Sequence, residues 1–338
     1  MTTYLPAPVS AGAPEQERRS RTTSLDSSDQ IFRAVLRGSG ITVLTIMGLV
    51  GLFLLIRGGE ALKKAGFGFL TTQAWEPDGG HFGIAGVLVG TILIALVAIF
   101  FALPLALGTA LYISEYAPRK LQRTLISIVD LMAAVPSVVY GLWGLFFLQG
   151  HVQGLARWIS TYLGWLPIFD VDGVDKDNAL IDRTVYGSSA FIAGIVVSLM
   201  ITPIACSVMR EAFMQAPQGE REGAYALGST KWGMIRAVVL PFGKGGIIGG
   251  MMLALGRALG ETIAVYLIIS IVFTIQPDIL HAGVGQISSL IALRFGEATG
   301  FGLSALMAAG LALFMMTLVI NFVASSIVAK SRSGAESD

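Results

Sequence analysis

The chain has 338 residues, of which 54% are hydrophobic and only 13% charged, and its mean hydropathy is +0.72. Soluble domains carry about 25% charged residues, so this composition excludes a soluble globular protein and predicts a membrane protein. The net charge of +1 gives no reason to expect a nucleic-acid partner, and the single cysteine, Cys206, excludes an intrachain disulfide.

The first 38 residues precede the first long apolar run. Residues 1–28 are rich in Pro, Ser, Thr and charged residues and lack the apolar core of a signal peptide. They predict a disordered tail. Residues 29–38 carry apolar side chains on one helical face, which predicts a short interfacial helix leading into the membrane.

Six apolar runs follow, each close to or above the length of about 20 residues that crosses a bilayer as a helix. The predicted spans are 39–56, 83–113, 125–148, 190–209, 245–274 and 302–329. A second tail is expected at residues 330–338. The sequence therefore predicts an all-α membrane protein with six transmembrane helices and one membrane domain, residues 39–329.

Six spans place both ends of the chain on the same side of the membrane. Of the 23 Lys and Arg residues, 15 fall on that side, seven on the other, and Arg257 lies inside a span. Lys and Arg concentrate on the cytoplasmic side of membrane proteins. Both termini and the loop at residues 210–241 are therefore expected to be cytoplasmic.

The loop at residues 210–241 contains a patterned stretch, EGAYALGSTKWGMIRAVVLP. It fits the pattern E-A-A, three residues, G, nine residues, I-x-L-P at Glu222, Ala224, Gly228, Leu240 and Pro241, with Gly223 in place of the second residue. This resembles the EAA loop of ABC importer permeases, and the resemblance implies a docking element for ATPase subunits. The alternative is an amphipathic connector. Gly228 is expected to end one helix and Pro241 to begin the next.

Three charged residues fall inside the predicted spans: Asp130, Arg257 and Glu261. A charge inside the bilayer is costly unless it faces protein or water, so each is a functional candidate. On a continuous helix Arg257 and Glu261 lie one turn apart and their side chains meet. The pair either fixes helix packing or lines a pathway in which Arg257 attracts an anion. Small residues nearby, among them Gly246 and Gly250, permit close packing and leave room beside the charges.

Three further stretches resemble the permeases of phosphate-specific ABC importers: GRALGETIAVYLI (256–268), SEYAPRKLQR (114–123) and VPSVVYGLWGLF (135–146). The resemblance covers about residues 30–330 and favours the C subunit over the paralogous A subunit. It implies a type I importer permease (MetI-like) core of five helices plus a flanking helix, in a bacterial cytoplasmic (inner) membrane. The implied partners are an A-type permease, two copies of an ATP-binding subunit, an extracytoplasmic phosphate-binding protein, phosphate and membrane lipid.

The resemblance also implies that Arg257 and Glu261 take part in phosphate passage. Hydrogen phosphate carries a proton that a carboxylate can accept in a hydrogen bond. Sulfate at neutral pH has none, so Glu261 would favour phosphate. The family often has Glu where this sequence has Asp130, which leaves a pathway role and a packing or polar contact open. Tyr140, close to Pro136, predicts a break in the third helix near the pathway, with simple packing as the alternative.

Catalytic chemistry is not expected. The full sequence contains no G-x-x-x-x-G-K-[ST] motif and no visible Ser/His/Asp constellation, and its three histidines (His81, His151 and His281) fall in separate loops without ligand-like spacing. No cofactor or metal is expected, and the energy must come from a separate ATPase. The outer loop at residues 149–188 predicts a surface-lying helix followed by an acidic segment, either a connector or a contact patch for the binding protein.

The leading hypothesis is therefore a permease subunit of an ATP-driven phosphate importer. Within this class, the A-type permease and importers of sulfate or molybdate stay open. A secondary anion transporter or channel is the alternative from another class, but no internal repeat is visible and the EAA spacing would be unexplained. A membrane-embedded enzyme would need a catalytic constellation.

Overall fold

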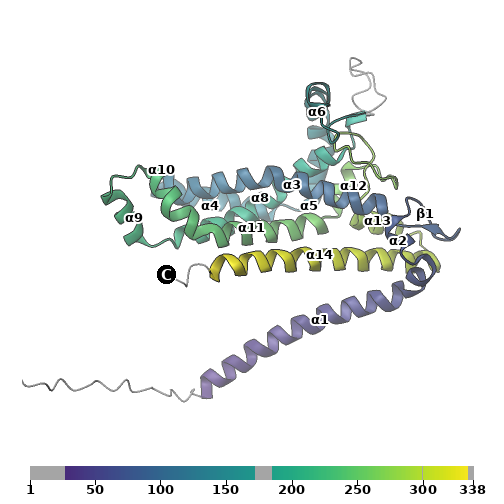
Figure 1. Cartoon of the computed structure of the whole chain (residues 1–338), viewed down its shortest axis with the longest axis horizontal. Helices are drawn as coiled ribbons and strands as arrows, with labels where there is room; N and C mark the ends of the chain where they lie inside the picture. Colours follow the sequence, from purple (N-terminus) through teal and green to yellow (C-terminus); the bar gives the residue numbers. More distant parts are fainter. Residues whose placement is uncertain (1–26, 172–184, 299, 334–338) are drawn as a thin grey trace, which may run out of the picture. The chain divides into compact units, whose positions relative to one another are not determined.

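The computed structural model describes residues 27–171, 185–298 and 300–333 (Figure 1). Most of the two predicted tails and of the acidic outer segment lies outside these residues, but residues 27–28 belong to the first helix and residues 330–333 to the last. The chain divides into two units, residues 1–50 and 51–338. The second unit holds the helical bundle and every site discussed below.

The first helix, α1, runs without interruption from Ser27 to Ala65. The expected interfacial helix at residues 29–38 is therefore not a separate element. The helix continues through Gly38 and Gly40 at its predicted end, and the Ser39 hydroxyl donates a hydrogen bond to the Val35 carbonyl oxygen (2.9 Å), so the polar side chain is satisfied within the helix. The helix ends before Gly66, whose φ of +53° suits glycine.

Within the described residues, five helices are long and apolar enough to cross a membrane, and a bent pair makes up to six. The five are α1; α3 (Ala85–Leu111) with the π-helical turn η1 (Tyr112–Tyr116); α8 (Ala190–Met214); α10 (Lys231–Met234), η4 (Ile235–Val239) and α11 (Leu240–Gly260) in succession; and α14 (Phe301–Ser333). The all-α membrane fold predicted from the sequence is confirmed.

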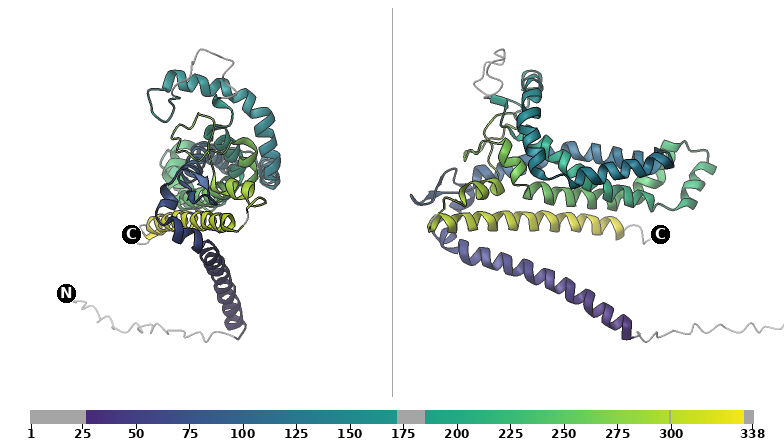
Figure 2. Two further views of the ribbon diagram at one scale, coloured as in Figure 1. Left: turned by 90° about the vertical axis from the view of Figure 1, so that its right-hand side faces the viewer. Right: turned by 180° about the vertical axis from the view of Figure 1, so that it is seen from behind.

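The third predicted span is bent. It consists of α4 (Arg119–Ala134), α5 (Ser137–Trp143), η2 (Gly144–Leu148) and α6 (Gln149–Leu163). The axis turns by 87° between α4 and α5, because Val135 is extended before Pro136 (Figure 2). The predicted break is present, a few residues before Tyr140, and the Tyr140 hydroxyl donates across it to the Met132 carbonyl oxygen (3.0 Å). The expected helix of the outer loop, α6, continues this bent span.

The fifth predicted span, residues 245–274, is not one helix. α11 ends at Gly260, the chain is extended at Glu261, and a short helix follows, α12 (Ile263–Ile268). Residues 269–286 are not helical, and α13 (Ile287–Arg294) comes next. α13 lies at one end of the bundle, next to α2 (Gly68–Thr71) and a hairpin of β1 (Trp75–Glu76) and β2 (His81–Phe82) (Figure 1). α9 (Gln218–Ala226) and α10 lie at the opposite end.

At the centre of the bundle, α8 packs against α3 on one side and α11 on the other. The small residues of α11 allow its close contact with α8. A Cβ atom on Gly246 would overlap the Cβ of Ala212, and one on Gly250 would lie 3.0 Å from the Ala205 carbonyl oxygen. The small-residue stripe noted in the sequence therefore serves close packing against α8.

The irregular segment after α12 lies directly on the first turns of α3. A Cβ atom on Gly86 would overlap the Phe273 carbonyl oxygen, and one on Gly90 would overlap that of Gly285. Only glycine allows the two backbones to approach so closely. This contact fixes where α13 begins and so positions the side chains around the helix break.

Candidate functional site

The patterned loop forms a helix with a defined end. The Ser229 amide donates to the Ala224 carbonyl oxygen (3.1 Å) and the Gly228 amide to that of Tyr225 (2.9 Å), while Gly228 has φ +82°. These two bonds with a left-handed glycine form a Schellman motif. The expectation that Gly228 ends the helix is confirmed.

The motif positions are largely open to solvent. Glu222, Gly223, Gly228 and Pro241 are exposed, and Ala224 and Leu240 are partly buried. Three exposed apolar side chains accompany them, Tyr225, Leu227 (89% exposed) and Trp232. Sequence reasoning missed these three, although apolar residues within an otherwise polar loop were a readable signal. Such a surface suits contact with another protein.

Arg221 anchors this loop to the bundle. Its Nη1 lies 3.0 Å from Oε2 of Glu115, whose side chain is only 4% exposed, and its Nη2 donates to the Phe213 carbonyl oxygen (2.6 Å). The Lys231 ammonium lies 4.6 Å from the centre of the Tyr116 ring. Glu115 and Tyr116 belong to η1, so the loop is tied to the junction of the second and third spans.

The helix break after Gly260 is closed by residues from α13. The Ser288 hydroxyl donates to the Glu261 carbonyl oxygen (2.8 Å) and the Ser289 hydroxyl to that of Thr262 (3.2 Å). The Glu261 carboxylate accepts from the Ala264 amide at the start of α12 (3.3 Å). Backbone groups released by the break are therefore paired, as a membrane interior requires.

Arg257 and Glu261 do not form the predicted one-turn contact. Because α11 ends at Gly260, the two residues no longer share a helical face, and no ion pair joins them within the part of the chain that the structure describes. Glu261 is buried (8% exposed), whereas Arg257 is exposed. The expectation of a continuous helix was wrong because sequence periodicity carries no sign of the contacts that stabilise the break.

Arg257 lines an open pocket of about 470 Å³. The other lining residues come from α8, α11 and α14: Ile204, Met252, Leu253, Gly256, Thr317 and Asn321. Asp130 is exposed on α4, and Tyr140 lies on α5 beyond the bend. Neither is among the residues that line this pocket, so the structure does not bring the four predicted pathway residues together.

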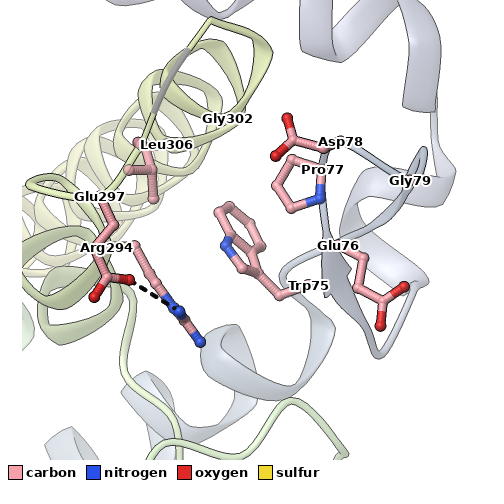
Figure 3. Close-up of a pocket in the computed structure, with 10 residues that line it drawn as sticks. Trp75, Glu76, Pro77, Asp78, Gly79, Arg294, Glu297, Gly302 and Leu306 are labelled. Atoms are coloured by element: carbon pink, nitrogen blue, oxygen red, sulfur yellow. Dashed lines mark hydrogen bonds and ion pairs between the residues drawn. The ribbon is translucent and has the colours of Figure 1, made fainter.

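A second pocket, of about 430 Å³, lies between the β hairpin and the α13–α14 connection (Figure 3). Trp75 and the acidic residues Glu76 and Asp78 form one wall, and an Arg294–Glu297 ion pair (3.2 Å) lies on the other. Across residues 27–171, 185–298 and 300–333, no three His, Cys, Asp or Glu side chains are grouped to hold a metal ion.

The family comparison matches residues 102–332 to the "Binding-protein-dependent transport system inner membrane component". The chain belongs to this family. It is the membrane component of a bacterial ABC transporter and works with other components of that transporter. As a member of this family the permease is non-catalytic.

Similar curated proteins cover nearly the whole permease. The phosphate transport system permease protein PstC 2 of Mycobacterium tuberculosis is 36% identical over 312 residues, covering 90% of this chain and 93% of its own. The protein PstC of Mesorhizobium japonicum is 37% identical over 311 residues, covering 91% and 93%.

Solved structures agree on the fold. The inward-facing MetNI methionine ABC transporter matches with a TM-score of 0.50 at 16% identity, over 73% of this chain and 94% of that chain. A bacterial ABC transporter that imports the polysaccharide alginate matches with a TM-score of 0.50 at 18% identity, over 89% and 99%. The type I importer architecture expected from the sequence is therefore confirmed.

Proposed function

We propose that the permease forms half of the translocation pathway of an ATP-driven inorganic phosphate importer. Its partners are an A-type permease, two copies of an ATP-binding subunit and an extracytoplasmic phosphate-binding protein. Both termini and the loop at residues 210–241 lie in the cytoplasm.

The observation that carries this proposal is the likeness to the two PstC proteins over about nine-tenths of both chains. A likeness over about nine-tenths of both chains supports a shared substrate better than one limited to the docking motif. The exposed arginine in an otherwise largely apolar pocket agrees with an anionic substrate.

The geometry of the α9–α10 loop supports ATPase docking. Glu222 is exposed beside the apolar side chains of Tyr225 and Leu227, and the ion pair of Arg221 with Glu115 connects this surface to η1. A displacement of the docked ATPase is therefore passed to the junction of two spans. ATP binding would turn the permease pair outward through this connection, and hydrolysis would reset it.

Arg257 is the proposed anion-binding group of the pathway. It is exposed in the isolated chain and has neither a hydrogen bond nor an ion pair within the described residues. A guanidinium in a largely apolar pocket lowers the energy of an anion strongly, because the local dielectric constant is low. Glu261, four residues further on at the break and outside the lining of this pocket, would favour the protonated oxyanion over sulfate. Asp130 and Tyr140 keep supporting roles beside the bend.

The test is radiolabelled phosphate uptake in cells that carry the complete transport system, comparing wild type with Arg257→Gln. We expect uptake to be lost while expression and ATPase co-purification stay normal. Exposed Arg37, on α1 and outside both the docking loop and the pocket, provides the matched control Arg37→Gln, which is expected to transport phosphate. Unchanged uptake by Arg257→Gln would contradict the proposed pathway.

A further inference from the structure

The last helix carries two polar side chains that the proposed pathway leaves unused. Thr317 and Asn321 are the polar residues in the otherwise apolar stretch 311–323 of α14. They are four residues apart, so they lie on one face of the helix. Polar residues in membrane helices usually face protein or water, which makes this pair a candidate for function.

Both side chains line the pocket of Arg257. Asn321 lies beside the turn of α11 that carries the arginine, because a Cβ atom on Gly256 would lie 3.8 Å from the Oδ1 atom of Asn321. The remaining lining side chains, from α8 and α11, are apolar. The polar groups of α11 and α14 thus meet in one pocket, although they are more than 60 residues apart in the sequence.

The amide of Asn321 has unused hydrogen-bonding capacity. The Thr317 hydroxyl donates to the Phe314 carbonyl oxygen (2.9 Å). Asn321, in contrast, makes no side-chain hydrogen bond to the described part of the chain, and it is exposed. An amide in apolar surroundings costs free energy unless it finds a partner. That partner must come from outside the described part of the chain.

We propose that Asn321 is a second anion-binding residue, which takes the translocated oxyanion together with Arg257. This inference rests on the proposed function. The side-chain NH₂ group donates hydrogen bonds to oxygens of the anion. The side-chain carbonyl oxygen accepts a hydrogen bond from the hydroxyl group of a protonated tetrahedral oxyanion. Arg257 supplies the charge, whereas Asn321 supplies a donor and an acceptor from the neighbouring helix α14. A hydrogen bond to the second permease would use the same amide, so the experiment separates these two roles.

The experiment measures the initial rate of radiolabelled phosphate uptake at saturating phosphate, in cells with the complete transport system. Asn321→Leu keeps a similar volume without polar atoms, Asn321→Gln keeps the amide, and Asn321→Asp keeps the shape but has only acceptors. Ser326→Ala is the matched control, since its hydroxyl donates to the Phe322 carbonyl oxygen on the same helix and Ser326 does not line the pocket. Assembly is measured by co-purification of the ATPase and of the second permease.

We expect Asn321→Leu to lower the uptake rate about tenfold, since a hydrogen bond to a charged group is worth at least that factor. Asn321→Asp should lower it further because it repels the anion. Asn321→Gln should stay within about threefold of wild type because it keeps the same donor and acceptor. The control should be normal, and the complex should assemble in all four variants.

Two results would overturn the assignment and leave the proposed function intact. One is normal uptake by Asn321→Leu while Arg257→Gln is inactive. The other is an equal loss in the Leu and Gln variants with less second permease co-purified, which would make Asn321 a subunit contact. Normal uptake by Arg257→Gln would contradict the proposed pathway itself, whatever the Asn321 variants do.

Discussion

Two regions of the permease are held by contacts of different range. The end of α9 is held by backbone hydrogen bonds between residues at most five positions apart in the sequence. The break after Gly260 is held by the hydroxyl groups of serines 27 positions away. The first region is exposed and holds its shape through a glycine and local backbone bonds. The second is buried and holds its shape through α13. The end of α9 therefore depends on local sequence, whereas the break requires the assembled bundle.

The largest effect is expected from charge reversal on the loop. Glu222→Lys should abolish phosphate uptake and ATPase co-purification while membrane insertion stays normal, because the exposed carboxylate lies on the proposed docking surface. Glu220→Lys makes the same charge change two residues away on α9 and is the matched control. Normal ATPase recruitment by Glu222→Lys would contradict the assignment of the loop.

A double change at the break should have the next largest effect. Ser288→Ala with Ser289→Ala leaves the Glu261 carbonyl oxygen without its side-chain donor, at a cost of about 1–3 kcal/mol, whereas the Thr262 carbonyl oxygen keeps the Tyr266 amide as a donor. We expect a lower melting temperature of the purified complex and about tenfold slower uptake. Ser198→Ala is the control, because this buried hydroxyl donates within its own helix to Ile195. A melting temperature equal to that of the control would mean that α13 does not stabilise the break.

Loss of the anchor between the loop and η1 should uncouple the transporter without releasing the ATPase. Arg221→Met leaves the buried Glu115 carboxylate unpaired, at a cost of about 3–5 kcal/mol when such a pair is broken. We expect uptake per ATP hydrolysed to fall several-fold while ATPase co-purification persists. Adding Glu115→Gln should recover part of the stability, since no buried charge then lacks a partner. Recovery of coupling as well would show that the ion pair is not the connection.

The smallest effects are expected from two glycines of the same loop, with opposite signs. Gly228→Ala places a Cβ atom at φ +82° and should destabilise the end of α9 by about 1–2 kcal/mol. Gly223 lies inside α9 with open space around it, so Gly223→Ala should stabilise the helix by about 0.5–1 kcal/mol. Amide hydrogen exchange of α9 measures both. Equal exchange in the two variants would contradict the Schellman geometry.

These differences explain which parts of the molecule were predictable. Apolar run length predicted the all-α membrane fold, and the end of α9 followed from Gly228 because its determinants are local. The break at Glu261 was not predictable, since a helical pattern continues through it and the stabilising hydroxyls belong to another element. Asn321 was overlooked because only charged residues were sought inside the spans, although a lone amide in an apolar helix was visible.

The close contact between residues 269–286 and α3 has a consequence for how the permease moves. At Gly86 and Gly90 backbone lies against backbone, valine side chains fill the space around these two points, and the Ile287 amide donates to the Thr91 hydroxyl oxygen (3.1 Å). The first turns of α3, the irregular segment and the start of α13 therefore form one rigid contact. We expect relative movement of the helices to be absorbed where the helical ladder is already irregular, as at η1 and at the bend before Pro136. η1 is also where the α9–α10 loop is attached, through Glu115.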